Sequence, residues 1–187
     1  MNLIHRWYCR SEGWGKVVKN YMIPHVLEDV SLGDDVLEIG PGPGLTTNVL
    51  REIAPRLTCI EIDHALAEKL KVRMAGTNVT VVEGDGTKMP FPDGSFSGAV
   101  SLTMLHHVPS AELQDRLLAE TCRVLKPGGV FAGSDSRPSL RWNLFHILDT
   151  RVPVNPETLP DRLERAGFTD VAVTQNPYAF RFRARKP

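Results

Sequence analysis

Short apolar runs alternate along the chain with longer amphipathic segments. The runs lie at residues 36–39, 57–62, 79–82, 99–102 and 130–132. Continuous apolar runs of this length are typical of strands that are buried on both faces. A regular alternation of such strands with helices predicts a parallel sheet whose two faces are covered by helices.

The segments between these runs carry apolar residues at helical spacing. They are Leu45, Val49, Leu50 and Ile53 in the first such segment and Leu66, Leu70 and Met74 in the second. Ser110 is expected to cap a third helix, which ends at the lysine-proline-glycine-glycine stretch 126–129. Thr158 and Asp161 predict a capping box at the start of a fourth helix, and Gly167 is its expected stop.

The two ends of the chain depart from this alternation. Runs at 171–174 and 179–184 flank a turn at Asn176 and Pro177, which predicts an antiparallel hairpin. The opening 30 residues are expected to be helical. Their shared apolar face would consist of Trp14, Val17, Val18, Tyr21 and Met22.

Composition places the chain among ordinary globular domains. It has 187 residues, of which 42% are hydrophobic and 24% are charged. The 22 basic residues balance 22 acidic ones, so the overall charge favours neither nucleic acid nor an anionic membrane as a partner. Cys9, Cys59 and Cys122 are far apart, which predicts free thiols in a reducing compartment. No segment matches a membrane span or a secretory signal, so we expect a cytoplasmic location.

The strongest chemical signal is a glycine-rich loop directly after the first apolar run. Gly40, Gly42 and Gly44 alternate with Pro41 and Pro43, and the first predicted helix follows them. Glycines let the backbone approach a ligand closely, and a helix N-terminus offers free N–H groups to an anion. By itself, such a loop is equally compatible with a tight turn between strand and helix.

Carboxylates stand near the ends of three successive predicted strands. Glu38 precedes the glycine loop, Glu61 closes the second run, and Asp85 follows the third. The carboxyl ends of adjacent strands in a doubly wound sheet line one crevice, so we expect all three side chains to reach the same cleft. A carboxylate after the second strand can accept hydrogen bonds from two ribose hydroxyls, and one after the third from an adenine amine. The alternative is that each is a solvated loop residue.

The spacing of the loop distinguishes two kinds of nucleoside cofactor. Dinucleotide-binding loops follow G-x-G-x-x-G, whereas this loop is G-x-G-x-G with Glu38 two residues before it. Glu38 would repel a pyrophosphate and attract a ligand that bears an ammonium or sulfonium group. The pattern therefore favours S-adenosylmethionine, and an NAD-dependent oxidoreductase is the alternative.

Four segments together resemble the class I S-adenosylmethionine-dependent methyltransferase family and its type 11-like domain. They are VLEIGPGPG, CIEID, VEGDGTKMPFPDGSFSGAVSLTMLHHV and RVLKPGGVF, and LPDRLERAGFTDVAVT continues the pattern. The resemblance implies an α/β fold: a Rossmann-like doubly wound seven-stranded sheet of order 3-2-1-4-5-7-6, with strand 7 antiparallel, in an α-β-α sandwich. We expect a single domain (1–187). Its parts would be an N-terminal helical arm (1–30), a cofactor-binding core (34–133), a substrate-side segment (135–155) and a C-terminal helix with a β-hairpin (156–187).

The same resemblance assigns residues to S-adenosylmethionine and its product S-adenosylhomocysteine. The methionine part would lie on the glycine loop, the ribose on Glu61, and the adenine against Ile62 and Asp85. Gly86 stands where the family more often has alanine. The implied cofactor-binding residues are Glu38, Gly40, Pro41, Gly42, Gly44, Glu61, Ile62, Gly84, Asp85, Gly86 and Thr103.

The turn after the fourth strand would lie beneath the sulfonium and carries two histidines. Imidazole titrates near neutral pH, so His106 and His107 are the candidates for a catalytic proton acceptor. The alternative is that they only shape the cofactor pocket. Because they are adjacent, we expect their side chains to diverge. The histidines show no metal-ligand spacing, so no metal is expected.

The methyl acceptor is expected to be a small molecule with an O, N, C or S nucleophile. The aromatic residues of the arm and of the substrate-side segment could cover a flat or apolar ligand, although an arm packed on the sheet is the alternative. They include Trp7, Tyr8, Trp14 and Tyr21 in the arm and Trp142 and Phe145 in the segment. No N-P-P-Y-type tetrapeptide follows the fourth strand, which argues against a nucleobase or protein-amide acceptor.

Basic residues near the C-terminus alternate with phenylalanines. They are Arg181, Arg183 and Arg185. This period of two is typical of a strand with one polar face, and an RNA-binding strip is the alternative. The balanced charge and the lack of an added RNA-binding domain argue against that alternative, so we expect no nucleic-acid partner. A non-catalytic module that binds cofactor or a partner is a further alternative, and the sequence does not determine the oligomeric state.

Overall fold

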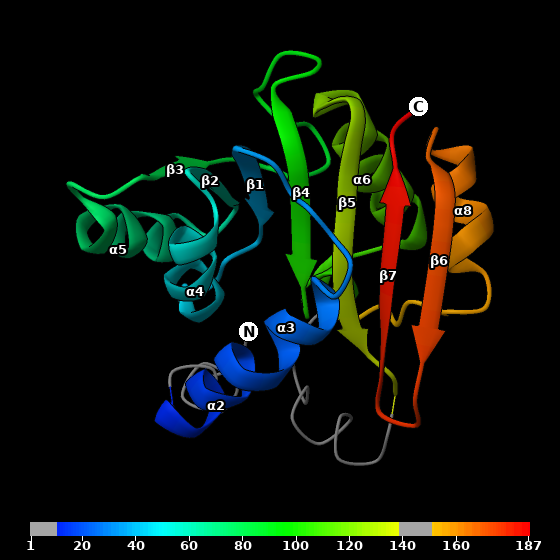
Figure 1. Cartoon of the computed structure of the whole chain (residues 1–187), viewed down its shortest axis with the longest axis horizontal. Helices are drawn as coiled ribbons and strands as arrows, with labels where there is room; N and C mark the ends of the chain where they lie inside the picture. The colour runs from blue at the N-terminus through cyan, green and yellow to red at the C-terminus, as the bar shows by residue number, and fades with distance from the viewer. Residues whose placement is uncertain (1–10, 139–150) are drawn as a thin grey trace.

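The protein folds into an open seven-stranded sheet, described by a computed structural model for residues 11–138 and 151–187 (Figure 1). The strands are β1 (Asp35–Ile39), β2 (Arg56–Glu61), β3 (Val79–Glu83), β4 (Phe96–Leu102), β5 (Leu125–Ser136), β6 (Thr169–Gln175) and β7 (Ala179–Arg185). They are arranged as β3-β2-β1-β4-β5-β7-β6. Strand β7 runs antiparallel to both of its neighbours, and the other pairs are parallel. The predicted fold, strand order and hairpin are confirmed.

Helices cover both faces of this sheet. They are α2 (Glu12–Val17), the π-helix η1 (Val18–Met22), α3 (Ile23–Val26), α4 (Leu45–Ile53), α5 (His64–Met74), the 3-10 turn η2 (Leu105–His107), α6 (Ala111–Val124) and α8 (Leu159–Arg165). Figure 1 shows α6 and α8 behind β5, β7 and β6, with α3 in front of the lower ends of β4 and β5. No helix within the described ranges combines the length and the apolar character that crossing a bilayer requires.

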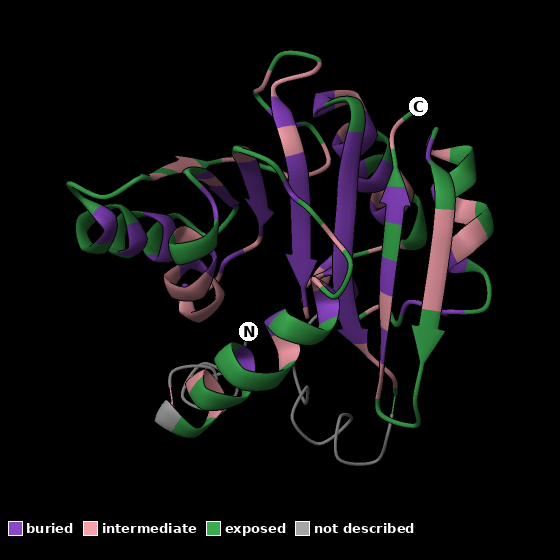
Figure 2. Ribbon diagram, in the orientation of Figure 1, coloured by how far each residue is buried: buried purple, intermediate pink, exposed green. Residues whose placement is uncertain are grey.

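Two apolar cores lie on opposite sides of the sheet. Successive residues of β4 point to different cores: Ala99 packs with the α6 and α8 side, and Val100 packs with the N-terminal helices, α4 and α5. The central strands are therefore buried along most of their length, whereas β6 at the edge is half exposed (Figure 2). Double coverage explains why the central strands are continuous apolar runs in the sequence.

Strand β7 follows the predicted period of two. Phe180, Phe182 and Ala184 are buried against the α6 and α8 side of the sheet. Arg183 and Arg185 are exposed, and Arg181 is half-buried and paired with Glu28. The basic residues thus form the polar face of a strand, as their alternation predicted.

The N-terminal helix differs from its prediction in two ways. Its inward residues recur every four positions and include Trp14, Val18 and Val26, whereas Val17 and Tyr21 are exposed. Its middle turn is a π-helix in which Ile23 N–H donates to Val18 O. Pro24 explains the wider turn, because it lacks an N–H and its ring would clash with a carbonyl one α-turn earlier. Trp7 and Tyr8 lie outside the described residues, as do Trp142 and Phe145.

The predicted capping box of α8 is wrong. The Thr158 side chain caps no N–H; its hydroxyl donates to Asn155 O at 3.3 Å. Asn155 instead organises this helix start, since its side chain accepts Glu157 N–H and its carbonyl accepts Leu159 N–H. An Asn turn thus replaces the Thr and Asp pair, because asparagine competes well for nearby backbone N–H groups.

Candidate active site

A cavity of about 430 Å³ opens at the carboxyl ends of β1, β2, β3 and β4. Ten residues predicted from sequence line it: Gly40, Pro41, Gly42, Glu61, Ile62, Gly84, Asp85, Gly86, Thr103 and His107. Glu38, Gly44 and His106 are not among the lining residues. The cavity therefore collects most of the residues implied for a nucleoside cofactor, from four separate stretches of chain.

The glycine loop bends sharply between β1 and α4. Gly40, Gly42 and Gly44 all have positive φ, at 67°, 54° and 76°. A Cβ atom on Gly40 would lie 2.3 Å from Met104 Cγ, so that position also needs glycine for space. The bend exposes backbone to the cavity directly before the N-terminus of a nine-residue helix.

Glu61 joins the glycine loop to the turn after β2. Its Oε2 accepts Gly42 N–H at 2.9 Å, and its Oε1 accepts Asp63 N–H at 3.0 Å. The residue is 6% exposed yet lines the cavity. Each carboxylate oxygen has two acceptor positions, so both oxygens retain capacity for a hydroxyl donor.

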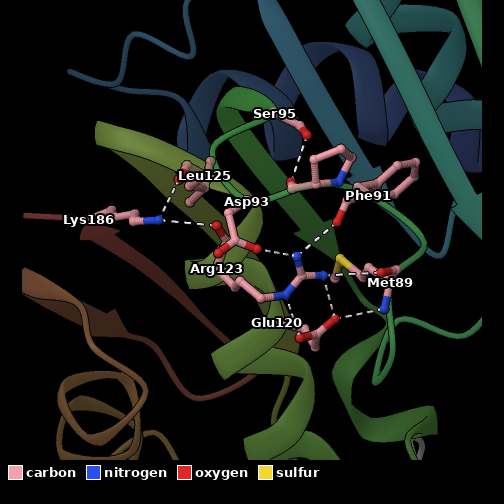
Figure 3. A network of polar contacts seen from close by, with 9 residues as sticks. Met89, Phe91, Asp93, Ser95, Glu120, Arg123, Leu125 and Lys186 are labelled. Atoms are coloured by element: carbon pink, nitrogen blue, oxygen red, sulfur yellow. Dashed lines mark hydrogen bonds and ion pairs between the residues drawn. The ribbon is translucent and has the colours of Figure 1, made fainter.

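Asp85 lies in the long connection between β3 and β4. Its Oδ1 accepts Thr87 N–H at 2.8 Å, which closes a local turn. The later part of this connection is fastened to α6 by Arg123, as Figure 3 shows. Arg123 donates to Phe91 O, Met89 O and the Asp93 carboxylate.

Glu120 completes this network from the same helix. Its carboxylate accepts from Arg123 and also accepts Met89 N–H at 2.8 Å (Figure 3). The hydrogen bond from Arg123 lowers the pKa of Glu120, and the Met89 N–H adds to this effect. The irregular connection that carries Asp85 is therefore held by a charged pair on α6.

The prediction that Glu38 reaches the cleft is wrong. Glu38 is 2% exposed and lies behind the glycine loop, where the Thr46 and Thr47 hydroxyls and the Cys59 thiol donate to its carboxylate. Burial raises the pKa of Glu38, and these donors oppose that rise. Side chains alternate along β1, so Glu38 points away from the cavity that its neighbour Ile39 lines. It faces the hydroxyl and thiol donors of α4 and β2 instead.

The turn after β4 begins with a strained residue. Thr103 has a φ of 52°, which is unfavourable for a β-branched side chain, and its N–H donates to Ser134 O at 2.8 Å. Thr103 and Met104 line the cavity, and the 3-10 turn η2 follows. Strained backbone at the wall of a cavity is typical of functional sites.

The two histidines of η2 have different surroundings. His106 is 2% exposed and its ring contacts Asp135, whereas His107 is half-buried and lines the cavity. Their ring centroids are 4.2 Å apart with an angle of 42° between the planes. The expectation of diverging side chains is wrong, because the 3-10 turn that carries the two histidines brings their rings into contact.

Sequence reasoning did not assign several lining residues to this cavity. Val108, Leu113 and Leu117 contribute apolar surface from the residues after η2 and from α6, and Met104 adds to it from the turn that was expected beneath the sulfonium. Trp14 of α2 also lines the cavity, and it was predicted only as part of an aromatic arm. Asp135, which binds His106, was missed, although a carboxylate at the end of a further strand could have signalled it.

One cluster of possible metal ligands occurs among the described residues. His64, Glu68 and Glu83 are all exposed, and their ligand atoms lie within 4.8 Å of one another. His64 is hydrogen-bonded to Glu83, which raises the pKa of His64, and Lys71 pairs with Glu68. None of these residues lines the cavity. Exposed charged residues of this kind pair commonly at protein surfaces.

A family model described as a methyltransferase domain matches residues 37–133, just over half of the chain. The chain belongs to this methyltransferase family. Membership confirms the predicted class I family and the predicted cofactor, S-adenosylmethionine. It also argues against the alternative of an NAD-dependent oxidoreductase.

Curated relatives are similar to part of this chain. A probable S-adenosylmethionine-dependent methyltransferase from Mycolicibacterium smegmatis is 29% identical over 143 residues, covering 73% of this chain and 52% of that protein. A probable ribosomal RNA small subunit methyltransferase A from Natronomonas pharaonis is 40% identical over 102 residues, covering 52% of this chain and 36% of that protein. The chain thus spans about half of the first relative's length and about a third of the second's.

Solved methyltransferase structures share the whole fold. An S-adenosylmethionine-dependent methyltransferase from Aquifex aeolicus superposes with a TM-score of 0.77 at 19% identity, covering 100% of both chains. A methyltransferase in complex with the Haloferax volcanii Trm112 activator superposes with a TM-score of 0.78 at 16% identity, covering 100% of this chain and 99% of that chain. At these identities the likeness establishes the fold.

Proposed function

We propose that this chain transfers a methyl group from S-adenosylmethionine to a small, largely apolar acceptor that enters beside His107. The observation that carries the proposal is the single cavity lined by the glycine loop, by Glu61 and Asp85, and by the turn after β4. The glycine loop, Glu61 and Asp85 suit the amino-acid and nucleoside portions of the cofactor. The turn after β4 is then left to face the transferred methyl group.

The residues present fit S-adenosylmethionine. Gly40 and Gly42 leave backbone uncovered at the start of α4, where a carboxylate can meet free N–H groups. Glu61 has acceptor capacity for two ribose hydroxyls, and Asp85 is placed on the next strand connection for an adenine amine. Ile62 lines the cavity and is 69% exposed, so an adenine ring would cover apolar surface that is now in water.

The bound cofactor would supply a methyl carbon made electrophilic by its sulfonium. The protein's own contribution is alignment of the acceptor with that carbon and exclusion of water. Thr103 and Met104 form the wall where the glycine loop meets the turn after β4. His107 is the better candidate for accepting an acceptor's proton, because it lines the cavity and His106 does not.

The lining on the acceptor side supports an apolar small molecule. Trp14, Met104, Val108 and Leu113 provide mainly apolar surface there, and His107 is the polar group among them. No lysine or arginine of the described residues lines the cavity, and RNA recognition relies on such cations to hold phosphates. The rRNA methyltransferase relative makes RNA the acceptor class to test against this proposal.

Cofactor binding can be tested by calorimetry with S-adenosylhomocysteine on wild-type protein and on Glu61→Ala, Asp85→Ala and the double variant. Each single change removes hydrogen bonds to a charged group, so affinity should fall by roughly 10–100-fold, and the double variant should not bind measurably. Glu164→Ala, on an exposed acid of α8, is the matched control and should bind like wild type. Retained affinity in the double variant, or tight binding of NADH without S-adenosylhomocysteine, would contradict the assignment.

The acceptor class can be tested with S-adenosylmethionine carrying a radiolabelled methyl group. Pools of quinones, phenols and other metabolites should become labelled, and ribosomal RNA should not. Label in RNA alone would replace the small-molecule proposal with an RNA substrate. Cofactor binding without transfer to any pool would favour the non-catalytic module.

A further inference from the structure

A buried acid and imidazole lie directly behind the cavity wall. Asp135, near the end of β5, is 1% exposed, and His106 is 2% exposed. Asp135 Oδ2 accepts the His106 backbone N–H at 3.0 Å, and Asp135 Oδ1 lies 2.5 Å from His106 Nδ1. One carboxylate therefore holds both the backbone and the ring of His106.

The hydrogen-bond chemistry of this carboxylate determines the tautomer of the ring. Asp135 Oδ1 also accepts Ser136 N–H at 2.7 Å. An ionised carboxylate can only accept hydrogen bonds, so the hydrogen of the ring contact belongs to His106 Nδ1. In the neutral ring Nε2 is then the nitrogen without a proton.

The surrounding contacts fix the turn that carries both histidines. Val152 N–H donates to His106 O at 2.8 Å, and the buried Gln114 side chain donates to Leu105 O at 3.2 Å. The His106 ring in turn packs against the His107 ring, with centroids 4.2 Å apart. A chain of contacts thus leads from β5 through His106 to the imidazole that lines the cavity.

Burying a carboxylate is costly unless donors compensate it, and an apolar pair of similar size could fill the same space. Three N–H groups converge on Asp135, which meets that cost. These directional hydrogen bonds also fix the orientation of the Asp135 and His106 side chains, which apolar packing alone would not do. The placement of such a pair one ring behind the cavity favours a positioning role.

We propose that Asp135 and His106 are positioning residues: Asp135 fixes the Nδ1-protonated form and the orientation of His106, and the His106 ring holds His107 toward the acceptor. The role assigned to His107 rests on the proposed function. The protonation site and the ring contact are properties of the protein without any substrate, so they can be tested separately.

The first test is long-range ¹H–¹⁵N NMR of the full chain labelled at histidine, with His106→Gln used to assign the His106 signals. The spectrum should show Nδ1 of His106 protonated. A neutral His106 with its proton on Nε2 would overturn the proposal. This measurement needs no variant at Asp135 and no methyl transfer.

The second test compares Asp135→Asn with Asp161→Asn, an exposed aspartate of α8. An asparagine has a single acceptor oxygen and an NH₂ donor, so it cannot accept all three N–H groups. Asp135→Asn should move the His106 proton toward Nε2 and shift the His107 ring signals, whereas Asp161→Asn should change neither. If Asp135→Asn does not fold, His106→Gln must shift the His107 signals.

Unchanged His107 signals in both Asp135→Asn and His106→Gln would reject the positioning of His107.

A titration with S-adenosylhomocysteine keeps the positioning proposal and the proposed function distinguishable. Asp135→Asn should bind S-adenosylhomocysteine within about 2-fold of wild type, because the cofactor residues are unchanged (about 0.4 kcal/mol). Failure of the wild type to bind would contradict the proposed function and leave the tautomer result standing.

Discussion

Gly40 illustrates how closely single residues are constrained in this site. Its φ of 67° is one that residues with a Cβ rarely adopt, and Met104 occupies the space that a Cβ would need. Met104 comes from the turn after β4, so Gly40 is the contact point between the glycine loop and the proposed acceptor wall. A glycine is required there by backbone conformation and by packing together.

Gly40→Ala should therefore reduce both stability and cofactor affinity. The positive φ alone costs about 1–2 kcal/mol, and displacement of Met104 adds about 1–3 kcal/mol. The displaced Met104 side chain would also enter the cavity and weaken S-adenosylhomocysteine binding. Chemical denaturation and calorimetry would measure the two effects.

Gly76→Ala is a matched control for this substitution. Gly76 has a similar φ of 76°, but a Cβ there would meet no atom within 4 Å. Its free energy of unfolding should fall only by the cost of the backbone conformation, and it should bind S-adenosylhomocysteine like wild type. Equal losses of stability in the two variants would mean that the Met104 side chain moves aside without a cost in free energy.

At the scale of elements, the connection between β3 and β4 depends on α6. No helix or strand occurs between residues 84 and 95, yet this stretch carries Asp85 and two lining glycines. Arg123 reaches from α6 to two of its carbonyl groups and to Asp93 (Figure 3). A helix that covers one face of the sheet thus also holds a loop that lines the cavity.

Arg123→Ala should loosen this connection. Loss of the charged hydrogen bonds to Met89 O and Phe91 O should lower the free energy of unfolding by about 1–3 kcal/mol, reduced by the partial exposure of the side chain. S-adenosylhomocysteine should bind more weakly, because Asp85 lies in the same connection. Urea unfolding and calorimetry would measure these changes.

Arg116→Ala is the control for the Arg123 substitution, since Arg116 lies on the same helix and is exposed. It should leave both stability and affinity unchanged. Arg123→Ala with unaltered affinity would show that Asp85 is positioned without the α6 network.

At the scale of the whole molecule, Asp35 links the starts of three strands. It opens β1 and accepts from Arg56 at the start of β2, at 2.5 Å, and from Lys126 near the start of β5, at 2.9 Å. The hydrogen bonds from Arg56 and then Lys126 hold the pKa of Asp35 well below its usual range. This link lies at the ends of the strands opposite the cavity.

This lowered pKa predicts a pH dependence of stability. The contribution of Asp35 is fully present above its unfolded pKa of about 3.9 and is lost as pH falls through the lower folded value. Asp35→Asn should therefore be less stable than wild type at pH 7, and the difference should narrow below about pH 4. Urea unfolding at several pH values would measure it, with added salt weakening the effect.

Asp34→Asn serves as the control, because Asp34 is the exposed neighbour of Asp35. It should match wild type across the same pH range. A difference between wild type and Asp35→Asn that stays constant down to pH 3 would mean that the ion pairs add no stability.

The sequence alone predicted the family and, through the resemblance to it, the strand order and the cofactor; it also named ten of the residues that line the cavity. Local patterns suffice for the elements themselves, because apolar runs specify buried strands and glycines specify the bend after β1. The carboxyl ends of parallel strands must then meet at one edge of the sheet. Only the tertiary structure decided that Glu38 turns away from the cavity and that Pro24 widens the N-terminal helix. It also brought Asp135 to His106, because residues 29 positions apart meet only once β4 and β5 have paired.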